Sequence, residues 1–272
     1  MGIELKAGDE VLTTTQDYPS VLPAWRQRAA RDGVVLKEIS FPTPPPNPED
    51  LLDRFARALT ARTRVIAFCQ VTYTTGQVFP VREICRMARA EGIQTIVDGA
   101  HAFAQFPFQA ADLECDYFGT SLHKWMMAPA ALRENIRKFE ATGVSPFAIR
   151  SAITGAVDFH ESVGADRKAA RLRYLRQYWM RRVAGLPGVK LLNVDDPRMS
   201  CGLGAMTLTG WDSTALTAYL MREHRIHVRA REVMGEFHCV RVTPNIYSTI
   251  EELETFCAAI ETASRNRMPN RN

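Results

Sequence analysis

YFGTSLHKWMMAP, residues 117–129, places a lysine directly after a short apolar run of the kind that forms a β-strand. His123 and Trp125 flank Lys124, and two methionines follow. Lysine is rarely buried without a partner, so a solvated side chain is the usual interpretation of any one lysine. A lysine at the end of a buried strand and beside a histidine can instead act as a Schiff-base nucleophile. The rest of the sequence decides whether Lys124 is a solvated lysine or a nucleophile.

The chain that leads up to Lys124 alternates between strand-like and helix-like segments. Strands are expected at 9–15, 34–39, 63–69, 93–97 and 117–121, and helices at 20–32, 49–59 and 81–91. Asn47 followed by Pro48 favours a helix start, and Gly92 favours a helix end. Because the strands are almost continuous apolar runs, the pattern predicts an α/β fold with a three-layer, mostly parallel sheet that is covered on both faces.

Three polar residues lie at or just beyond the ends of these strands. Thr72 follows the run TRVIAFC, Asp98 follows IQTIV, and Lys124 follows YFGTS. In parallel sheets of this kind, ligands bind outside the carboxyl ends of the strands. The sequence therefore predicts a ligand site that these residues share.

From residue 132 onward the pattern changes. Helical periodicity dominates as far as residue 183, where the stretch GLPGV interrupts it. Strands are then expected at 190–194, 204–209, 226–229 and 239–242, with helices at 214–223 and 250–263. This order predicts a second, smaller α+β domain at the C-terminal end.

Composition excludes several classes of protein. The 272 residues are 46% hydrophobic and 24% charged with a net charge of +4, as in ordinary soluble globular chains. A run of eighteen apolar residues and a secretory signal are both absent from the sequence, which predicts a cytoplasmic protein without a membrane partner. The six cysteines are far apart and form no C-x-x-C pair, which favours reduced thiols over disulfides and predicts no metal site.

Asp98 and Lys124 together indicate a specific cofactor. A lysine that forms an aldimine with pyridoxal phosphate (PLP) needs a carboxylate nearby that keeps the pyridine nitrogen protonated, and VDGAH followed by SLHK supplies both. Ser121 and His123 are then placed to bind the phosphate, and His101 to meet the ring hydroxyl. Taken singly, these residues have plainer interpretations as a helix cap, a strand-end histidine and a solvated lysine. Their joint occurrence at two strand ends favours the cofactor.

The motifs GDEVLTT at 8–14, VDGAH at 97–101 and S-x-H-K at 121–124 resemble the class V aminotransferases. These are PLP-dependent enzymes of fold type I that include cysteine desulfurases and isopenicillin N epimerase, and the epimerase-like branch looks most similar. The resemblance runs over nearly the whole chain. It implies a PLP-binding large domain, incomplete here, at 1–131, a helical connection at 132–185 and a small α+β domain at 186–272.

The resemblance also implies roles for individual residues. Lys124 would form the internal aldimine, and Asp98 would hold the pyridinium. His101 and Thr72 would contact the ring oxygen, and Ser121 and His123 would bind the phosphate. Arg241 would bind the substrate carboxylate, since the arginine fork can make two parallel hydrogen bonds to it. An amino-acid substrate and a homodimer with the active site at the subunit interface are also implied.

The chain departs from the family pattern in four places. An N-terminal segment with a strand, a helix and a phosphate-contacting threonine is missing, and strands after the lysine are deleted. Gln16 stands where the epimerases carry a histidine that stacks on the cofactor ring. Gly143-Val144 replaces a Gly-Thr pair whose threonine reaches the phosphate of the neighbouring subunit. The sequence therefore resembles a family member that is truncated at its N-terminus and carries an internal deletion.

Three other functions stay open. A pseudoenzyme or interaction protein would retain the scaffold without the chemistry. A cysteine desulfurase needs a mobile cysteine, and Cys239 lies in a strand-like run that predicts a buried, inert thiol. The stretch 165–185 carries seven basic residues, but its apolar residues repeat at helical spacing, which predicts a core helix with solvated arginines and no nucleic-acid partner. Transamination, racemisation and elimination cannot be told apart from the sequence.

Overall fold

The computed structural model describes residues 3–128 and 147–265. Its first part is a sheet of five parallel strands in the order β2-β1-β3-β4-β5. The strands are β1 (Glu10–Thr14), β2 (Val35–Ile39), β3 (Thr63–Cys69), β4 (Gln94–Asp98) and β5 (Tyr117–Gly119). The predicted α/β fold with a mostly parallel sheet is confirmed.

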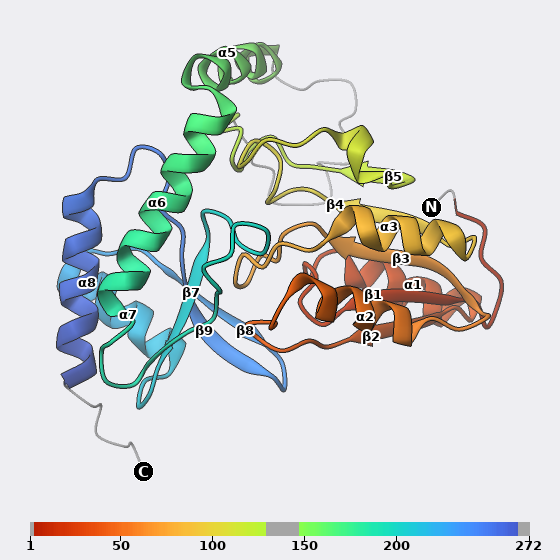
Figure 1. The fold of residues 1–272 in the computed structure, drawn as a ribbon, viewed down its shortest axis with the longest axis horizontal. Coiled ribbons are helices and arrows are strands. Elements are labelled where there is room, and N and C mark those ends of the chain that lie inside the picture. Colours follow the sequence, from red (N-terminus) through yellow and green to blue (C-terminus); the bar gives the residue numbers. More distant parts are fainter. Residues whose placement is uncertain (1–2, 129–146, 266–272) are drawn as a thin grey trace.

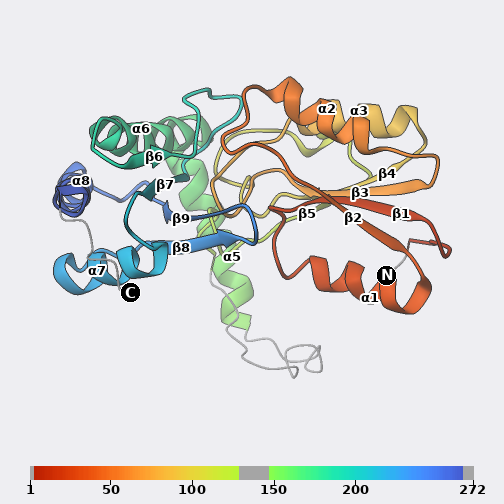
Figure 2. The ribbon, with the colours of Figure 1, turned by 90° about the horizontal axis from the view of Figure 1, so that it is seen from below.

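Helices cover both faces of this sheet (Figures 1 and 2). Helices α2 (Pro48–Ala58) and α3 (Val81–Ala90) lie on one face, where Phe55 and Ile84 pack with Ile66. Helix α1 (Leu22–Asp32) covers the other face through Trp25, which packs against Val65. Residues 65–68 of β3 alternate between the two cores, which explains why the strand is apolar from Val65 to Cys69.

Local signals place two of these helix ends as predicted. The Asn47 side chain accepts a hydrogen bond of 2.7 Å from the Asp50 amide, so it caps α2. Gly92 follows α3 with φ of 67°, in the left-handed region that glycine adopts without a steric penalty.

The second part of the chain is a four-stranded antiparallel sheet in the order β6-β7-β9-β8. Its strands are β6 (Val189–Leu191), β7 (Gly204–Leu208), β8 (Arg229–Val233) and β9 (Phe237–Val242), and its helices are α6 (Ala165–Val183), α7 (Ser213–His224) and α8 (Ile250–Arg265). Helix α5 (Phe147–Val163) precedes them, and a short 3-10 helix, η1 (Ala110–Leu113), lies before β5. The smaller α+β part was therefore predicted correctly.

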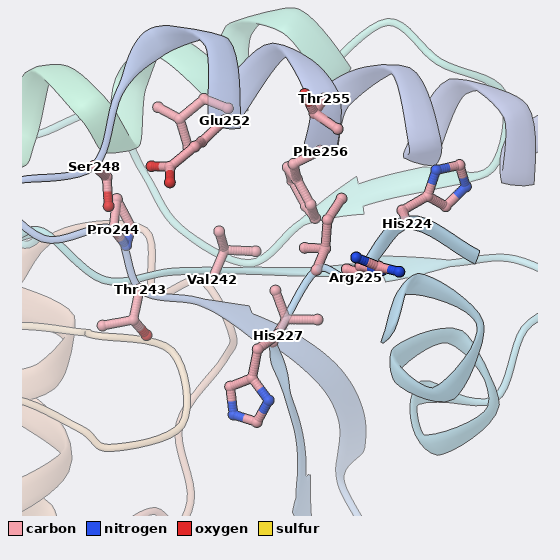
Figure 3. Close-up of a pocket in the computed structure, with 13 residues that line it drawn as sticks. His224, Arg225, His227, Val242, Thr243, Pro244, Ser248, Glu252, Thr255 and Phe256 are labelled. Atoms are coloured by element: carbon pink, nitrogen blue, oxygen red, sulfur yellow. The ribbon is translucent and has the colours of Figure 1, made fainter. Parts of the chain in front are cut away.

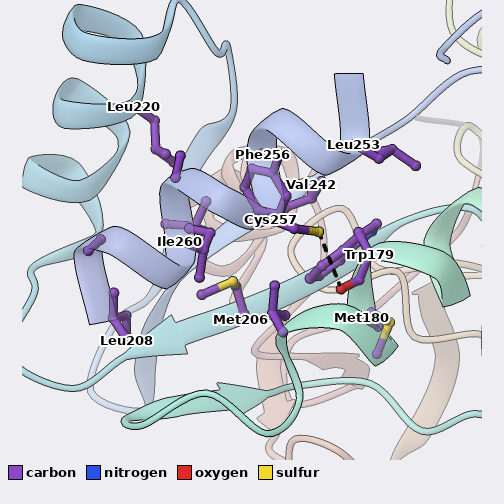
Figure 4. Close-up of a cluster of buried hydrophobic side chains, with 14 of the residues drawn as sticks. Trp179, Met180, Met206, Leu208, Leu220, Val242, Leu253, Phe256, Cys257 and Ile260 are labelled. Atoms are coloured by element: carbon purple, nitrogen blue, oxygen red, sulfur yellow. Dashed lines mark hydrogen bonds between the residues drawn. The ribbon is translucent and has the colours of Figure 1, made fainter. Parts of the chain in front are cut away.

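A large apolar core joins this sheet to its helices (Figure 4). Trp179 of α6 lies edge-on to Phe256 of α8, with ring centroids 5.6 Å apart, and both pack with Met206 and Val240. The apolar residues predicted to form the inner face of α6 are all buried: Ala169, Leu172, Leu175, Trp179 and Val183.

Two expectations about this half of the chain were wrong. The strand expected at 226–229 begins only at Arg229, because Arg225 ends α7 in a left-handed conformation and the β8 pairing with β9 starts at Arg229. The basic residues of α6 are not all solvated either. Lys168 and Arg176 are each only 1% exposed, because they lie on the side of the helix that packs against the rest of the chain.

Candidate active site

The carboxyl edge of the parallel sheet brings Asp98 to the surface of the first domain. The strand register aligns Asp98 of β4 with Gly119 of β5. A Cβ at Gly99 would approach the ring of Phe118 to 2.0 Å, so a larger residue would force that ring to move where the chain turns away from the strand. The Ala100 amide donates to Asp98 Oδ1 at 2.8 Å, and no donor among the described residues reaches the second oxygen. One carboxylate oxygen is therefore available to a ligand.

Lys124 lies in the turn that follows β5. The Ala128 amide closes this turn on the carbonyl of Leu122 at 3.0 Å. The half-buried ammonium group lies 5.2 Å from the centroid of the Tyr18 ring, and no carboxylate within the described parts of the chain is within 4 Å of it. Burial lowers the pKa of Lys124, while the nearby charge of Asp98 acts in the opposite direction. A lysine with a lowered pKa is more often the neutral amine, the form that attacks a carbonyl.

His101 is held as a neutral imidazole. Burial, and secondly the charge of Lys124, lower the pKa of His101 to about 3. The indole N–H of Trp125 donates to Nδ1 of His101 at 3.4 Å, which leaves the ring proton on Nε2. His101 can therefore donate a hydrogen bond from Nε2 at neutral pH.

Arg241 reaches the same region from β9 of the second sheet. Its Nη1 donates to the backbone carbonyl of Tyr73 at 2.7 Å, and its buried Nε has no acceptor among the described residues. Burial lowers the pKa of Arg241 to about 10, which still leaves it charged at neutral pH. The side chain thus keeps donors for an anion between the two sheets.

The structure brings five of the seven predicted site residues within electrostatic reach of one another, and a sixth, Ser121, lies in the same turn. Lys124, Arg241 and His123 all act electrostatically on His101, and Asp98 acts on Lys124. Ser121 lies half-buried in the same turn as His123. Its hydroxyl makes no hydrogen bond to any described residue.

Thr72 lies deeper than its predicted role requires. It is fully buried, and its hydroxyl is 2.9 Å from Thr75 Oγ1 and accepts from the Gln77 amide at 3.0 Å. The contact of Thr72 with a cofactor oxygen therefore stays a prediction. Gly143 and Val144 lie outside the described residues.

The sequence interpretation missed Tyr18, the aromatic residue beside Lys124. Gln16, expected at the ring-stacking position, is instead fully buried, donates to Thr43 at 2.9 Å and accepts from Thr74 at 3.2 Å. The Tyr18 ring lies edge-on to Tyr73, with centroids 5.3 Å apart. A tyrosine two residues after Gln16 was visible in the sequence, but nothing local indicated which side chain faces the lysine.

Asp17 was also missed, and it holds the end of β1 to the end of β3. Its carboxylate accepts bonds of 2.6 to 2.8 Å from the Cys69 amide, the Thr13 hydroxyl, and the amide and hydroxyl of Thr14. This network orders the loop from which Tyr18 projects. Asp17, Tyr18 and Asp98 also border an apolar cavity of about 240 Å³ on the α1 side of the sheet.

Lys168 supports the turn of Lys124 from outside the site. Its buried ammonium group donates to the backbone carbonyl of Trp125, the residue after Lys124. Burial lowers the pKa of Lys168 to about 8. Helix α6 is thereby tied to the segment that carries the candidate nucleophile.

A second cavity, of about 340 Å³, lies in the small domain and contains none of the predicted site residues (Figure 3). His224, Arg225 and His227 line one side of it, and Ser248 and Glu252 come from the segment at the start of α8.

Cys239 does not supply a mobile thiol. It is fully buried, and burial raises its pKa to about 12. The described residues contain no cluster of three or more side chains that would hold a metal ion. Within the same residues, no helix is both long enough and apolar enough to cross a bilayer.

Comparison with known proteins identifies relatives of this arrangement. Residues 1–132 match the family model described as aminotransferase class-V. The isopenicillin N epimerase of Streptomyces clavuligerus is 28% identical over an alignment 299 residues long, gaps included, and the alignment covers 95% of this chain and 75% of that protein. A cysteine desulfurase of Synechococcus elongatus is 25% identical over an alignment 295 residues long, and that alignment covers 94% of this chain and 46% of that protein.

The solved structures agree on the fold. A mutant of C-DES with glycine covalently linked to its PLP cofactor superposes with a TM-score of 0.82 at 20% identity, over 96% of this chain and 76% of that one. These matches confirm the predicted resemblance: the chain is related to the class-V aminotransferases and has the fold of the PLP-dependent enzymes of fold type I.

Proposed function

We propose that the chain is a PLP-dependent enzyme that acts on an amino acid, with Lys124 as the residue to which the cofactor is attached. The observation that carries the proposal is a half-buried amine that feels the charge of a carboxylate, Asp98, at the carboxyl edge of a parallel sheet. Bound PLP supplies an electron sink for negative charge that develops on the amino acid. The relatives named above, an epimerase and a desulfurase, support this class of reaction.

The residues at the site fit this cofactor. The unpaired oxygen of Asp98 would accept the hydrogen of the pyridinium nitrogen and so hold its charge. Nε2 of neutral His101 would donate to the ring oxygen. The Tyr18 ring, which already faces the Lys124 ammonium group, would offer an apolar surface to the cofactor ring. Ser121 and His123 follow β5 and would supply donors to the phosphate.

Arg241 would hold the substrate at its carboxylate. Its unpaired Nε and its position beside Tyr73 leave a fork of donors directed into the region between the two sheets. Lys124 would also serve as the base that moves a proton at the substrate, because burial lowers its pKa.

Reduction with borohydride tests the attachment. The protein is incubated with PLP, reduced, digested and mapped by mass spectrometry, and the pyridoxyl group is expected on Lys124. Lys124→Ala should remove the label, while Lys190→Ala, at an exposed lysine on β6, should keep it. A label that is spread over surface lysines, or absent at saturating PLP, would refute the assignment.

The same PLP-treated protein distinguishes the proposed enzyme from two alternative functions. A pseudoenzyme would show no visible absorbance from bound cofactor and no label. A cysteine desulfurase would convert cysteine to alanine and pass the sulfur to an enzyme thiol as a persulfide, but the burial of Cys239 does not favour it. The homodimer implied by the family is a further proposal, and sedimentation equilibrium measures it directly.

A further inference from the structure

The edge strand β8 and its neighbour β9 carry a row of arginines on one face of the small sheet. In the antiparallel pairing of β8 with β9, Arg231 lies opposite Cys239 and Arg229 lies opposite Arg241. Directly opposed residues point to the same side of a sheet, and alternate residues along a strand do so as well. Val240 and Val242 point to the other side and pack under the helices. Arg231 and Arg241 therefore share the face that meets the large domain.

Arg231 lies over Tyr73 and has no charged partner among the described residues. Its guanidinium carbon is 5.6 Å from the centroid of the Tyr73 ring. Its Nη1 makes one long bond, of 3.4 Å, to the adjacent carbonyl of Ala230, and its buried Nε has no acceptor among the described residues. No carboxylate within the described parts of the chain lies within 4 Å of either Arg231 or Arg241. Most of the donors of Arg231 are therefore unused.

Arg231 and Arg241 meet at the same tyrosine, which connects them to the candidate site. Arg241 bonds the Tyr73 carbonyl, Arg231 lies over the Tyr73 ring, and that ring contacts Tyr18, which faces Lys124. Both arginines lower the pKa of His101, so their charges reach the site. Partly buried cations that repel each other are costly without counter-charge, and buried donors in folded proteins are normally paired. The arrangement therefore calls for an anionic ligand with more than one negative group.

We propose that Arg231 binds a second carboxylate of the substrate, so that the substrate is a dicarboxylic amino acid. This rests on the proposed function, in which Arg241 binds the α-carboxylate. Arg231 and Arg241 are diagonal neighbours across the strand pair, and such positions lie about 7–8 Å apart. Two long side chains that converge from this spacing suit the two ends of a short diacid. The planar guanidinium fork matches a carboxylate at each end.

Binding of simple acids to the protein without added cofactor tests the role of Arg231. Glutarate carries two carboxylates and butyrate carries one, and calorimetric titration measures both. Glutarate is expected to bind the unmodified protein more tightly than butyrate. Arg231→Gln should weaken glutarate binding roughly 10- to 100-fold, the loss of one charge-assisted contact, and leave butyrate unchanged. Arg231→Lys should recover part of the difference, because it keeps the charge but not the fork.

The controls separate this proposal from the one on which it rests. Arg222→Gln removes an exposed arginine on α7 and should change neither affinity. Arg241→Gln should weaken both acids. The proposal is overturned if glutarate binds no more tightly than butyrate, or if Arg231→Gln leaves glutarate binding intact in a protein with unchanged circular dichroism. Loss of the borohydride label on Lys124 would refute the cofactor assignment and leave the glutarate result standing.

Discussion

Replacement of Lys168 by methionine is expected to change how the stability of the protein depends on pH. Lys168 is 1% exposed, and its ammonium group donates to the Trp125 carbonyl. Burial lowers its pKa from 10.5 to about 8. A base whose pKa is lower in the folded chain than in the unfolded chain stabilises the fold above its unfolded pKa. It loses that stabilisation as the pH falls through its folded pKa.

These values set the size of the effect. Between pH 7 and pH 9, a shift from 10.5 to about 8 raises the free energy of unfolding by about 1.3 kcal/mol. Lys168 borders a cavity of about 480 Å³, and solvent there screens part of the charge, which reduces the expected effect to roughly 1 kcal/mol. At pH 7 itself, Lys168→Met should change the free energy of unfolding little. The substitution removes the cost of burying a charge, but it also removes the hydrogen bond to Trp125.

Urea unfolding followed by circular dichroism at pH 7 and pH 9 measures this difference. The unmodified protein should gain about 1 kcal/mol more than Lys168→Met over that interval. Lys190→Met, at an exposed position, should behave like the unmodified protein. The reasoning fails if Lys168→Met shows the same pH dependence as the unmodified chain, since the buried ammonium would then not titrate as described.

Four further outcomes are expected. Asp98→Asn should still take up PLP with visible absorbance but should lose amino-acid turnover at least ~10-fold, which corresponds to about 1.4 kcal/mol in the activation barrier. Equal turnover in the variant would mean that the carboxylate only caps the backbone. Tyr18→Ala should expose Lys124, raise its pKa and move the pH profile of borohydride labelling upward, whereas Tyr18→Phe should leave the profile in place. Thr72→Val should destabilise the fold by about 1–2 kcal/mol in urea unfolding without a selective loss of PLP affinity; a loss of affinity at unchanged stability would instead support its predicted contact with the ring. Val144→Thr should tighten PLP binding about 10-fold in a fluorescence titration if the family dimer forms, and no gain would contradict the family alignment at that position.

The strands, the helices and the strand-end residues of the first domain could be predicted because their signals are local. Apolar runs define β3 and β4, Asn47 and Gly92 define helix ends, and Asp98 directly follows an apolar run. In a parallel sheet, carboxyl ends necessarily share one edge. The prediction that Asp98 and Lys124 lie near each other thus needed only the strand assignment.

The strand at 226–229 could not be placed correctly from the sequence. Arg229 and Arg231 interrupt the apolar pattern of β8, because that side of the strand faces Tyr73 of the large domain and not an apolar core. A polar face between two domains has no signature in the periodicity of a single strand.

The sequence by itself determined the order of elements, the class of fold and a lysine–aspartate pair at the sheet edge, because these depend on neighbours along the chain. Only the tertiary structure decided that Tyr18 and not Gln16 faces Lys124, that Thr72 and Lys168 are buried, and that Arg231 joins Arg241. Those outcomes depend on which side chains from distant segments occupy the same space. Packing in three dimensions sets them, and the local pattern of residues does not.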